Sequence, residues 1–252
     1  MARTVRATIP DRWMRIPSEK PIATQIILGL LVAVFVLGSV SPQLNIWFTN
    51  HGSLLRKPML IGEWWRLITA TFLHDGIVHI ALNGFSLYMI GIEVEALFGR
   101  AQFIAIYAIS GLAGSVAFFL FEEAPGLGAS GAIFGVFGAL VVYYALNRSL
   151  FGAFGRKNFN VILIVLVGNI AFGYLINTTG IASVGNEAHI GGLIAGAAVG
   201  FVLCPRYILG KWRNPIVREI ENINTGPLPW VATILIALIT IGIYIDGLIY
   251  FR

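Results

Sequence analysis

The chain alternates between long apolar runs and short polar segments. The apolar runs are each about 17–24 residues long, which is enough to cross the hydrocarbon core of a bilayer as a helix. They cover residues 22–40, 68–91, 102–121, 127–146, 159–177, 188–204 and 229–249. Glu122, Glu123 and Pro125 interrupt the pattern between the third and fourth runs, so one continuous helix is excluded there. The pattern therefore predicts seven membrane-spanning helices.

The polar segments divide the chain into four parts. Residues 1–21 form an N-terminal segment, 22–205 a six-helix core, 206–228 a polar linker, and 229–252 a seventh transmembrane helix. The first run is longer than the apolar part of a signal peptide, so we interpret it as a retained helix. Residues 41–66 mix aromatic side chains with scattered charges, which is typical of a segment lying in the membrane interface. We predict an all-α polytopic membrane protein.

Composition and charge support this prediction and give an orientation. Only 12% of the residues are charged and 57% are hydrophobic, whereas a soluble domain has roughly twice that charged fraction. With the N-terminus inside, the inner segments hold Arg3, Arg6, Arg12, Arg15, Lys20, Arg100, Arg148, Arg156, Lys157, Arg206, Lys211, Arg213 and Arg218. The outer segments hold Arg56, Lys57, Arg66 and Arg252. This bias predicts a cytoplasmic N-terminus and an outside C-terminus, in what we expect to be the plasma membrane of the cell.

The net charge of +5 is explained by these loops, and no basic stripe predicts a nucleic-acid partner. The single cysteine, Cys204, excludes an internal disulfide.

A few polar side chains lie within the apolar runs. His79 and Asn83 fall in the second, Ser130 opens the fourth, and His189 opens the sixth. Buried polar groups are costly in hydrocarbon unless they are paired or functional. At about 1.5 Å per residue, His79, Ser130 and His189 each lie roughly 18–24 Å from the inner end of their run, in one layer in the outer half of the membrane.

Glycines on the fourth and sixth runs predict that these helices pack closely. The fourth carries Gly128 and Gly131, and the sixth carries Gly192 and two further glycines at intervals of four residues. Small residues at this spacing let helix backbones approach each other in a membrane. Such packing would bring the hydroxyl of Ser130 within reach of His189.

Each signal taken alone has a simpler interpretation. The segment Gly128–Gly131 fits a packing patch, and the histidines fit interhelical hydrogen bonds. A soluble-hydrolase elbow is not indicated, because Ala132 replaces the last glycine of G-x-S-x-G. The joint occurrence of a serine, a histidine and two side-chain donors in one layer favours a catalytic site.

The residues in these positions resemble the rhomboid family of intramembrane serine proteases. The similar segments are Gly62–Arg66, Phe72–Asn83, Glu95–Gly99, Tyr107–Gly111, Gly128–Ala132 and Ala188–Gly192. They occur in the expected order over roughly residues 40–205. The seventh run resembles the helix that some members add after the core.

The resemblance implies roles for individual residues. Ser130 matches the nucleophile and His189 the base, while His79, Asn83 and the backbone N–H of Ser130 match the donors to the oxyanion. Phe134 takes the place of a tyrosine that stacks on the histidine in some members.

Other matches are supporting ones. Trp65 and Arg66 match a structural or lipid-facing pair in the first outer loop, and Glu95 matches a residue that holds the turn after the second core helix. Gly128, Gly131 and Gly192 are expected to allow close packing.

The chemistry expected of these groups is peptide hydrolysis within the membrane. A serine hydroxyl is a weak nucleophile until a base takes its proton, and neutral His189 can do so and later protonate the leaving amine. No carboxylate is placed in the sequence to orient His189, so we predict a dyad and an acyl-enzyme intermediate. We expect single-span membrane proteins in a lipid bilayer as substrates, and no cofactor, metal or nucleic acid.

Three other functions are compatible with these residues. The chain could be an inactive member that binds clients without cutting, or a transporter or channel with a polar path. A metal site formed by His74, His79 and His189 is also conceivable. His74 is one turn or more from His79, however, and no H-E-x-x-H signature is present.

Overall fold

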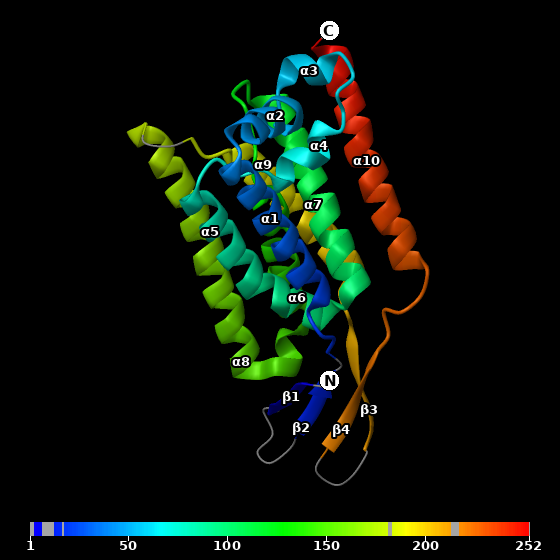
Figure 1. The fold of residues 1–252 in the computed structure, drawn as a ribbon. Coiled ribbons are helices and arrows are strands. Elements are labelled where there is room, and N and C mark those ends of the chain that lie inside the picture. Colours follow the sequence, from blue (N-terminus) through cyan, green and yellow to red (C-terminus); the bar gives the residue numbers. More distant parts are fainter. Residues whose placement is uncertain (1–2, 7–12, 17, 181–182, 213–216, 252) are drawn as a thin grey trace.

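The computed structural model describes the chain except residues 1–2, 7–12, 17, 181–182, 213–216 and 252, and its elements are labelled in Figure 1. The helices are α1 (Ile22–Val40), α2 (Pro42–Gly52), α3 (Arg56–Leu60), α4 (Arg66–Thr69), η1 (Ala70–Phe72), α5 (Ile77–Ser86), η2 (Leu87–Gly91), α6 (Ile92–Phe98), α7 (Arg100–Phe121), α8 (Ser130–Thr179), α9 (Asn186–Leu203) and α10 (Leu228–Tyr250). The strands are β1 (Arg3–Arg6), β2 (Trp13–Ile16), β3 (Tyr207–Trp212) and β4 (Val217–Asn222).

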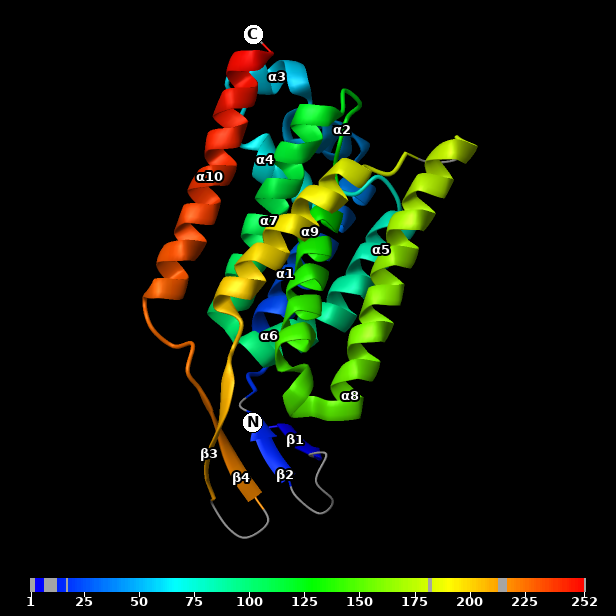
Figure 2. The same cartoon turned by 180° about the vertical axis from the view of Figure 1, so that it is seen from behind.

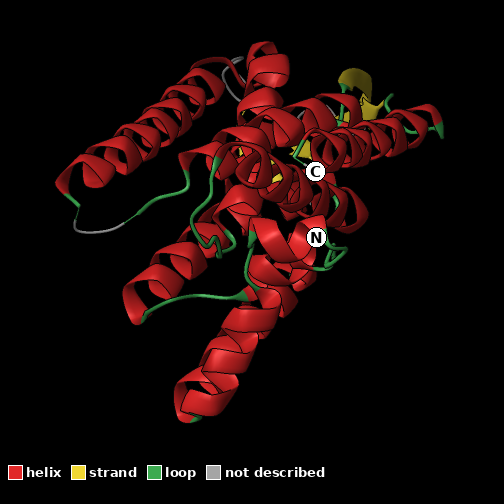
Figure 3. Cartoon of the chain, turned by 90° about the horizontal axis from the view of Figure 1, so that it is seen from above, coloured by secondary structure: helices red, strands yellow, loops and turns green. Residues whose placement is uncertain are grey.

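Seven helical segments of the described chain are long and apolar enough to cross a membrane. This confirms the predicted all-α polytopic membrane fold. The two ends of the chain lie at opposite ends of the bundle (Figure 1), as an odd number of spans requires. Viewed from above, helices fill almost the whole outline and the strands lie behind them (Figure 3).

The centre of the bundle is formed by α7, the first part of α8 and α9, which pack against one another (Figure 2). The span Ser130–Asn147 within α8 is the most buried, with 72% of its residues inside the protein. The span Phe151–Thr179 within α8 is far less covered, with 11% of its most apolar window buried, and it stands beside α5 at the edge of the bundle (Figures 1 and 2). The fourth span is therefore the scaffold of the fold.

The fourth and fifth spans are joined without a long loop. Gly152 has φ 53° and ψ −127°, so α8 is kinked there between two helical segments. A positive φ of this kind is adopted at low cost only by glycine.

The second span differs from the predicted run 68–91. It covers Ile77–Phe98, and Leu73–Gly76 separate it from the short helices α4 and η1. The polar residues His74 and Asp75 lie in this break, and Gly99, with φ 99°, follows the last residue of the span. The prediction was wrong because the apolar residues before the break extended the hydropathy signal. His79 consequently lies in the first turn of the span, closer to its start than expected.

A four-stranded sheet lies at the end of the bundle near the N-terminus (Figure 1), and the sequence analysis did not predict it. The strand order is β1-β2-β4-β3, with β1–β2 and β3–β4 antiparallel and β2–β4 parallel. The sheet therefore joins the N-terminal segment to the segment 206–228, which we had interpreted as a linker. Short strands that pair across almost the whole chain leave little local pattern in the sequence.

Candidate active site

Ser130 is the first residue of α8, and the backbone before it is set by a glycine. Gly128 has φ 125° and donates its N–H to the carbonyl of Ala70 at 2.9 Å. The N–H groups of the first helical turn have no acceptor within the helix. The hydroxyl and the backbone N–H of Ser130 therefore lie together at a helix N-terminus, where negative charge is favoured.

The hydroxyl of Ser130 meets the imidazole of His189. Ser130 Oγ lies 2.8 Å from His189 Nε2, and His189 is only 8% exposed in the first turn of α9. The ring of Phe134 stacks on the imidazole with 4.1 Å between centroids and 6° between planes. His189 Nδ1 is buried and has no hydrogen-bond partner among the described residues. The serine and the histidine can thus exchange a proton directly.

Close contact between the backbones of α8 and α9 brings these two residues together. A Cβ atom on Gly192 would overlap the carbonyl oxygen of Gly131, and one on Gly196 would overlap the backbone of Gly135. A Cβ on Gly200 would lie 2.6 Å from the Cα of Ala139. These glycines are required because any side chain would push the two helices apart.

His79 and Asn83 approach the same place from α5. A Cβ atom built on Gly128 would lie 2.7 Å from His79 Nε2 and 3.8 Å from Asn83 Nδ2. Both nitrogens therefore lie beside Gly128, two residues before Ser130. This convergence fits a site that donates several hydrogen bonds to one developing negative charge.

Two residues of this region were missed by the sequence analysis or wrongly placed in it. Asp75 Oδ1 lies 2.6 Å from His79 Nδ1, and the spacing of four residues was the available signal. His74 is not separated from His79 as predicted, because their rings meet edge to face with 4.9 Å between centroids. Burial, followed by the nearby charge of His79, lowers the pKa of His74 from 6.5 to about 4, so His74 is neutral at neutral pH.

Comparison with known proteins identifies this architecture. The sequence model of the Rhomboid domain matches residues 61–206. The chain belongs to the rhomboid family. Rhomboid protease GluP of Bacillus subtilis is 37% identical over 183 residues, which cover 70% of this chain and 34% of that protein.

Two relatives from Arabidopsis thaliana are similar as well. RHOMBOID-like protein 5 is 38% identical over 65% of this chain and 53% of its own length. The chloroplastic RHOMBOID-like protein 9 is 31% identical over 81% of this chain and 47% of its own length. The chain thus spans about a third to a half of these relatives.

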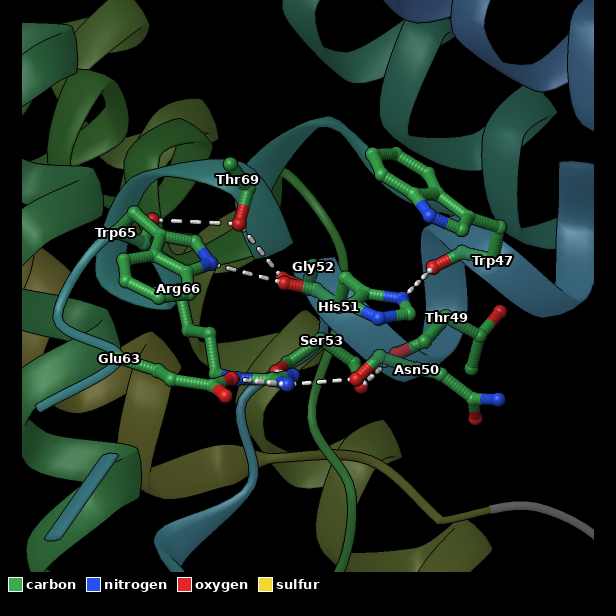
Figure 4. Close-up of polar contacts among 10 residues, drawn as sticks. All are labelled: Trp47, Thr49, Asn50, His51, Gly52, Ser53, Glu63, Trp65, Arg66 and Thr69. Atoms are coloured by element: carbon green, nitrogen blue, oxygen red, sulfur yellow. Dashed lines mark hydrogen bonds and ion pairs between the residues drawn. The ribbon is translucent and has the colours of Figure 1, made fainter. Parts of the chain in front are cut away.

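In this rhomboid, the side chains of Trp65 and Arg66 donate hydrogen bonds to backbone carbonyls at the C-terminal end of α2 (Figure 4). The buried guanidinium of Arg66 donates to the carbonyls of Ser53 at 2.7 Å and Asn50 at 2.6 Å, and its Nε donates to Glu63 at 2.7 Å. The indole N–H of Trp65 donates to the carbonyl of His51 at 3.1 Å, while 40% of Trp65 stays exposed. Arg66 is therefore structural, because it satisfies carbonyls that a helix end leaves unpaired.

Glu95 links the end of the second span to the start of the first. Its fully buried carboxylate accepts hydrogen bonds from the N–H groups of Ala23 and Thr24 at 2.8 and 2.7 Å and from the Thr24 hydroxyl at 2.8 Å. The Nε of Arg100, the first residue of α7, lies 3.5 Å from this carboxylate. The Glu95 carboxylate therefore caps the N-terminus of α1, and its backbone carbonyl accepts a hydrogen bond from the N–H of Gly99, in the turn that follows, at 3.0 Å.

Proposed function

We propose that this rhomboid is an intramembrane serine endopeptidase that cleaves peptide bonds in or near the transmembrane helices of other membrane proteins. The observation that carries the proposal is the 2.8 Å contact between Ser130 Oγ and His189 Nε2. Membership of a family in which a relative is named a protease supports it.

The reaction follows from the positions of the groups. His189 Nε2 takes the proton of Ser130 as Oγ attacks the scissile carbonyl, and then delivers it to the leaving amine. The oxyanion accepts hydrogen bonds from His79, Asn83 and the backbone N–H of Ser130. Water then attacks the acyl-enzyme with His189 again as base, which releases the second product and restores the hydroxyl.

The absence of a described partner for His189 Nδ1 supports a dyad. The stack with Phe134 restrains the ring in place of a third hydrogen-bonded residue.

The substrate class follows from where the site lies. Ser130 and His189 are at the ends of their helices that lie away from the sheet, and His79 is in the first turn of its span. A single-span helix that unwinds at this level would present its backbone to the serine, and water would enter from the same side. We propose that this side is the outside of the cell, with the N-terminus and the sheet in the cytoplasm, because positive loops stay inside.

The test is cleavage of a panel of single-span substrates in detergent and in proteoliposomes by the wild type, Ser130→Ala and His189→Ala. We expect both variants to lose cleavage and both to keep the wild-type melting temperature. A fluorophosphonate probe should label the wild type but not Ser130→Ala. If the folded wild type neither cleaves nor takes the label but still binds clients, the chain is a non-proteolytic member and the proposal falls.

A further inference from the structure

The carboxylate of Asp75 is hydrogen-bonded to His79, on the side of the ring that points away from Gly128. Asp75 Oδ1 lies 2.6 Å from His79 Nδ1, and Nε2 of the same ring lies beside Gly128. Asp75 is in the break before α5 and His79 is in the first turn of that helix. The Asp75 side chain is 71% exposed and that of His79 is 30% exposed. Asp75 is thus exposed on the surface of the protein while its carboxylate contacts His79.

The contact with Asp75 determines where the protons of the His79 ring lie. An ionised carboxylate only accepts hydrogen bonds, so the proton in the Asp75–His79 contact sits on Nδ1. A neutral imidazole with its proton on Nδ1 has a bare Nε2, which is an acceptor. A bare nitrogen would repel an oxyanion, so His79 can donate from Nε2 only if the ring carries both protons.

We propose that Asp75 is a positioning residue that holds His79 in the doubly protonated form, so that a cation, and not a neutral donor, faces the oxyanion. The proposal rests on the proposed protease function. Hydrogen bonds in which one partner is ionised are roughly twice as strong as neutral ones. The carboxylate also fixes the plane of the ring through its short contact, as second partners of functional histidines commonly do.

The other groups around His79 are compatible with a single positive charge. His74, from the same break, is the nearest ring, and its lowered pKa of about 4 leaves it neutral at neutral pH. Asn83, one turn along α5, is uncharged, and His189 must be neutral to act as the base. Asp75 is thus the charge that balances His79, and the pair adds no net charge to the site.

The kinetic test compares Asp75→Ala, Asp75→Asn and Asp75→Glu with Glu123→Gln, which removes a carboxylate of the neighbouring loop that pairs with Arg56. We expect Asp75→Ala to lower kcat about tenfold to a hundredfold with KM unchanged, which is less than the 10²–10³ typical of deleting a donor. Asp75→Asn should lose less, because its amide can donate to Nδ1 and leave the proton on Nε2. Asp75→Glu should recover most of the loss, and Glu123→Gln should match the wild type. Wild-type kcat in Asp75→Ala would overturn the proposal.

A spectroscopic test does not depend on turnover. The chain has four histidines, so ¹⁵N-histidine labelling in micelles, with His79→Gln to assign the signal, resolves the ring of His79. At neutral pH we expect two protonated nitrogens in the wild type and one in Asp75→Asn, and a bare Nε2 or Nδ1 in the wild type overturns the proposal. If the wild type shows both protons but no Ser130-dependent cleavage occurs, the charge assignment stands and the protease function fails. The two failures are therefore distinguishable.

Discussion

The ring of Phe134 lies parallel to the imidazole of His189, 4.1 Å away between centroids. Phe134 is four residues after Ser130 on α8, so it lies one turn along the same helix face. Stacking against Phe134 opposes tilting of the imidazole plane about the Cβ–Cγ bond of His189. It therefore keeps Nε2 directed at the hydroxyl.

The first prediction concerns this stack. Phe134→Ala removes a contact of the kind that contributes about 0.5–1.5 kcal/mol, so we expect kcat to fall about twofold to tenfold. Phe134→Tyr keeps the ring and should retain the wild-type kcat. Steady-state cleavage of one single-span substrate measures both. Equal kcat for Phe134→Ala and the wild type would mean that the stack does not orient the base.

The second prediction concerns the donor that is not a histidine. Asn83→Ala should lower kcat by about 10²–10³, because one hydrogen bond to the developing oxyanion is lost. The buried side chain of Asn83 contacts the site, whereas Asn169 is an exposed amide in the fifth span. Asn169→Ala is therefore the matched control and should cleave like the wild type. A change confined to KM in Asn83→Ala would assign Asn83 to substrate binding instead.

The third prediction concerns the contact between α8 and α9. In Gly192→Ala the new methyl group overlaps the carbonyl of Gly131, so the helices must separate. We expect destabilisation of about 1–3 kcal/mol and loss of Ser130 labelling by a fluorophosphonate.

The control is Gly242→Ala in α10, where a new Cβ meets no atom within 4 Å. This variant should melt at or slightly above the wild-type temperature, since alanine is the better helix former. A fully stable and reactive Gly192→Ala protein would contradict the packing argument.

The fourth prediction concerns stability at acid pH. The unfolded chain protonates His74 near pH 6.5, whereas burial lowers the folded-state pKa to about 4. The unfolded state therefore binds more protons between these values, and stability should fall as the pH drops from about 6.5 to about 4, by at most about 3 kcal/mol. His74→Phe, which keeps a buried ring, should lose this dependence in thermal unfolding scans.

The exposed His51 provides the control for that experiment. His51→Gln should unfold with the same pH dependence as the wild type. An unchanged pH dependence in His74→Phe would show that another group is responsible.

Much of this architecture could be read from the sequence because lipid imposes simple demands on it. The third span was predicted within two residues, since Arg100 and Glu122 flank an uninterrupted apolar run. Ser130 and His189 stood out because polar groups are rare inside such runs. The glycine spacing then indicated which helices touch.

The features that were missed depend on contacts between distant segments. Glu95 caps α1 from more than seventy residues away, and no local pattern reveals that pairing. The start of the second span was misplaced because hydropathy averages over the polar break at His74 and Asp75. Asp75 itself was overlooked because an acid just outside an apolar run is ordinary unless its partner is known.

The sheet has a consequence for the order in which the protein is made. Its β2 strand is synthesised before the first span, but its neighbour β4 follows the sixth. Trp13–Arg15 therefore cannot pair with Val217–Glu219 until the six core helices have been synthesised. The complete sheet can therefore form only after the core has been made. In a chain arrested before β4, the edge of β2 that pairs with β4 would be left unpaired.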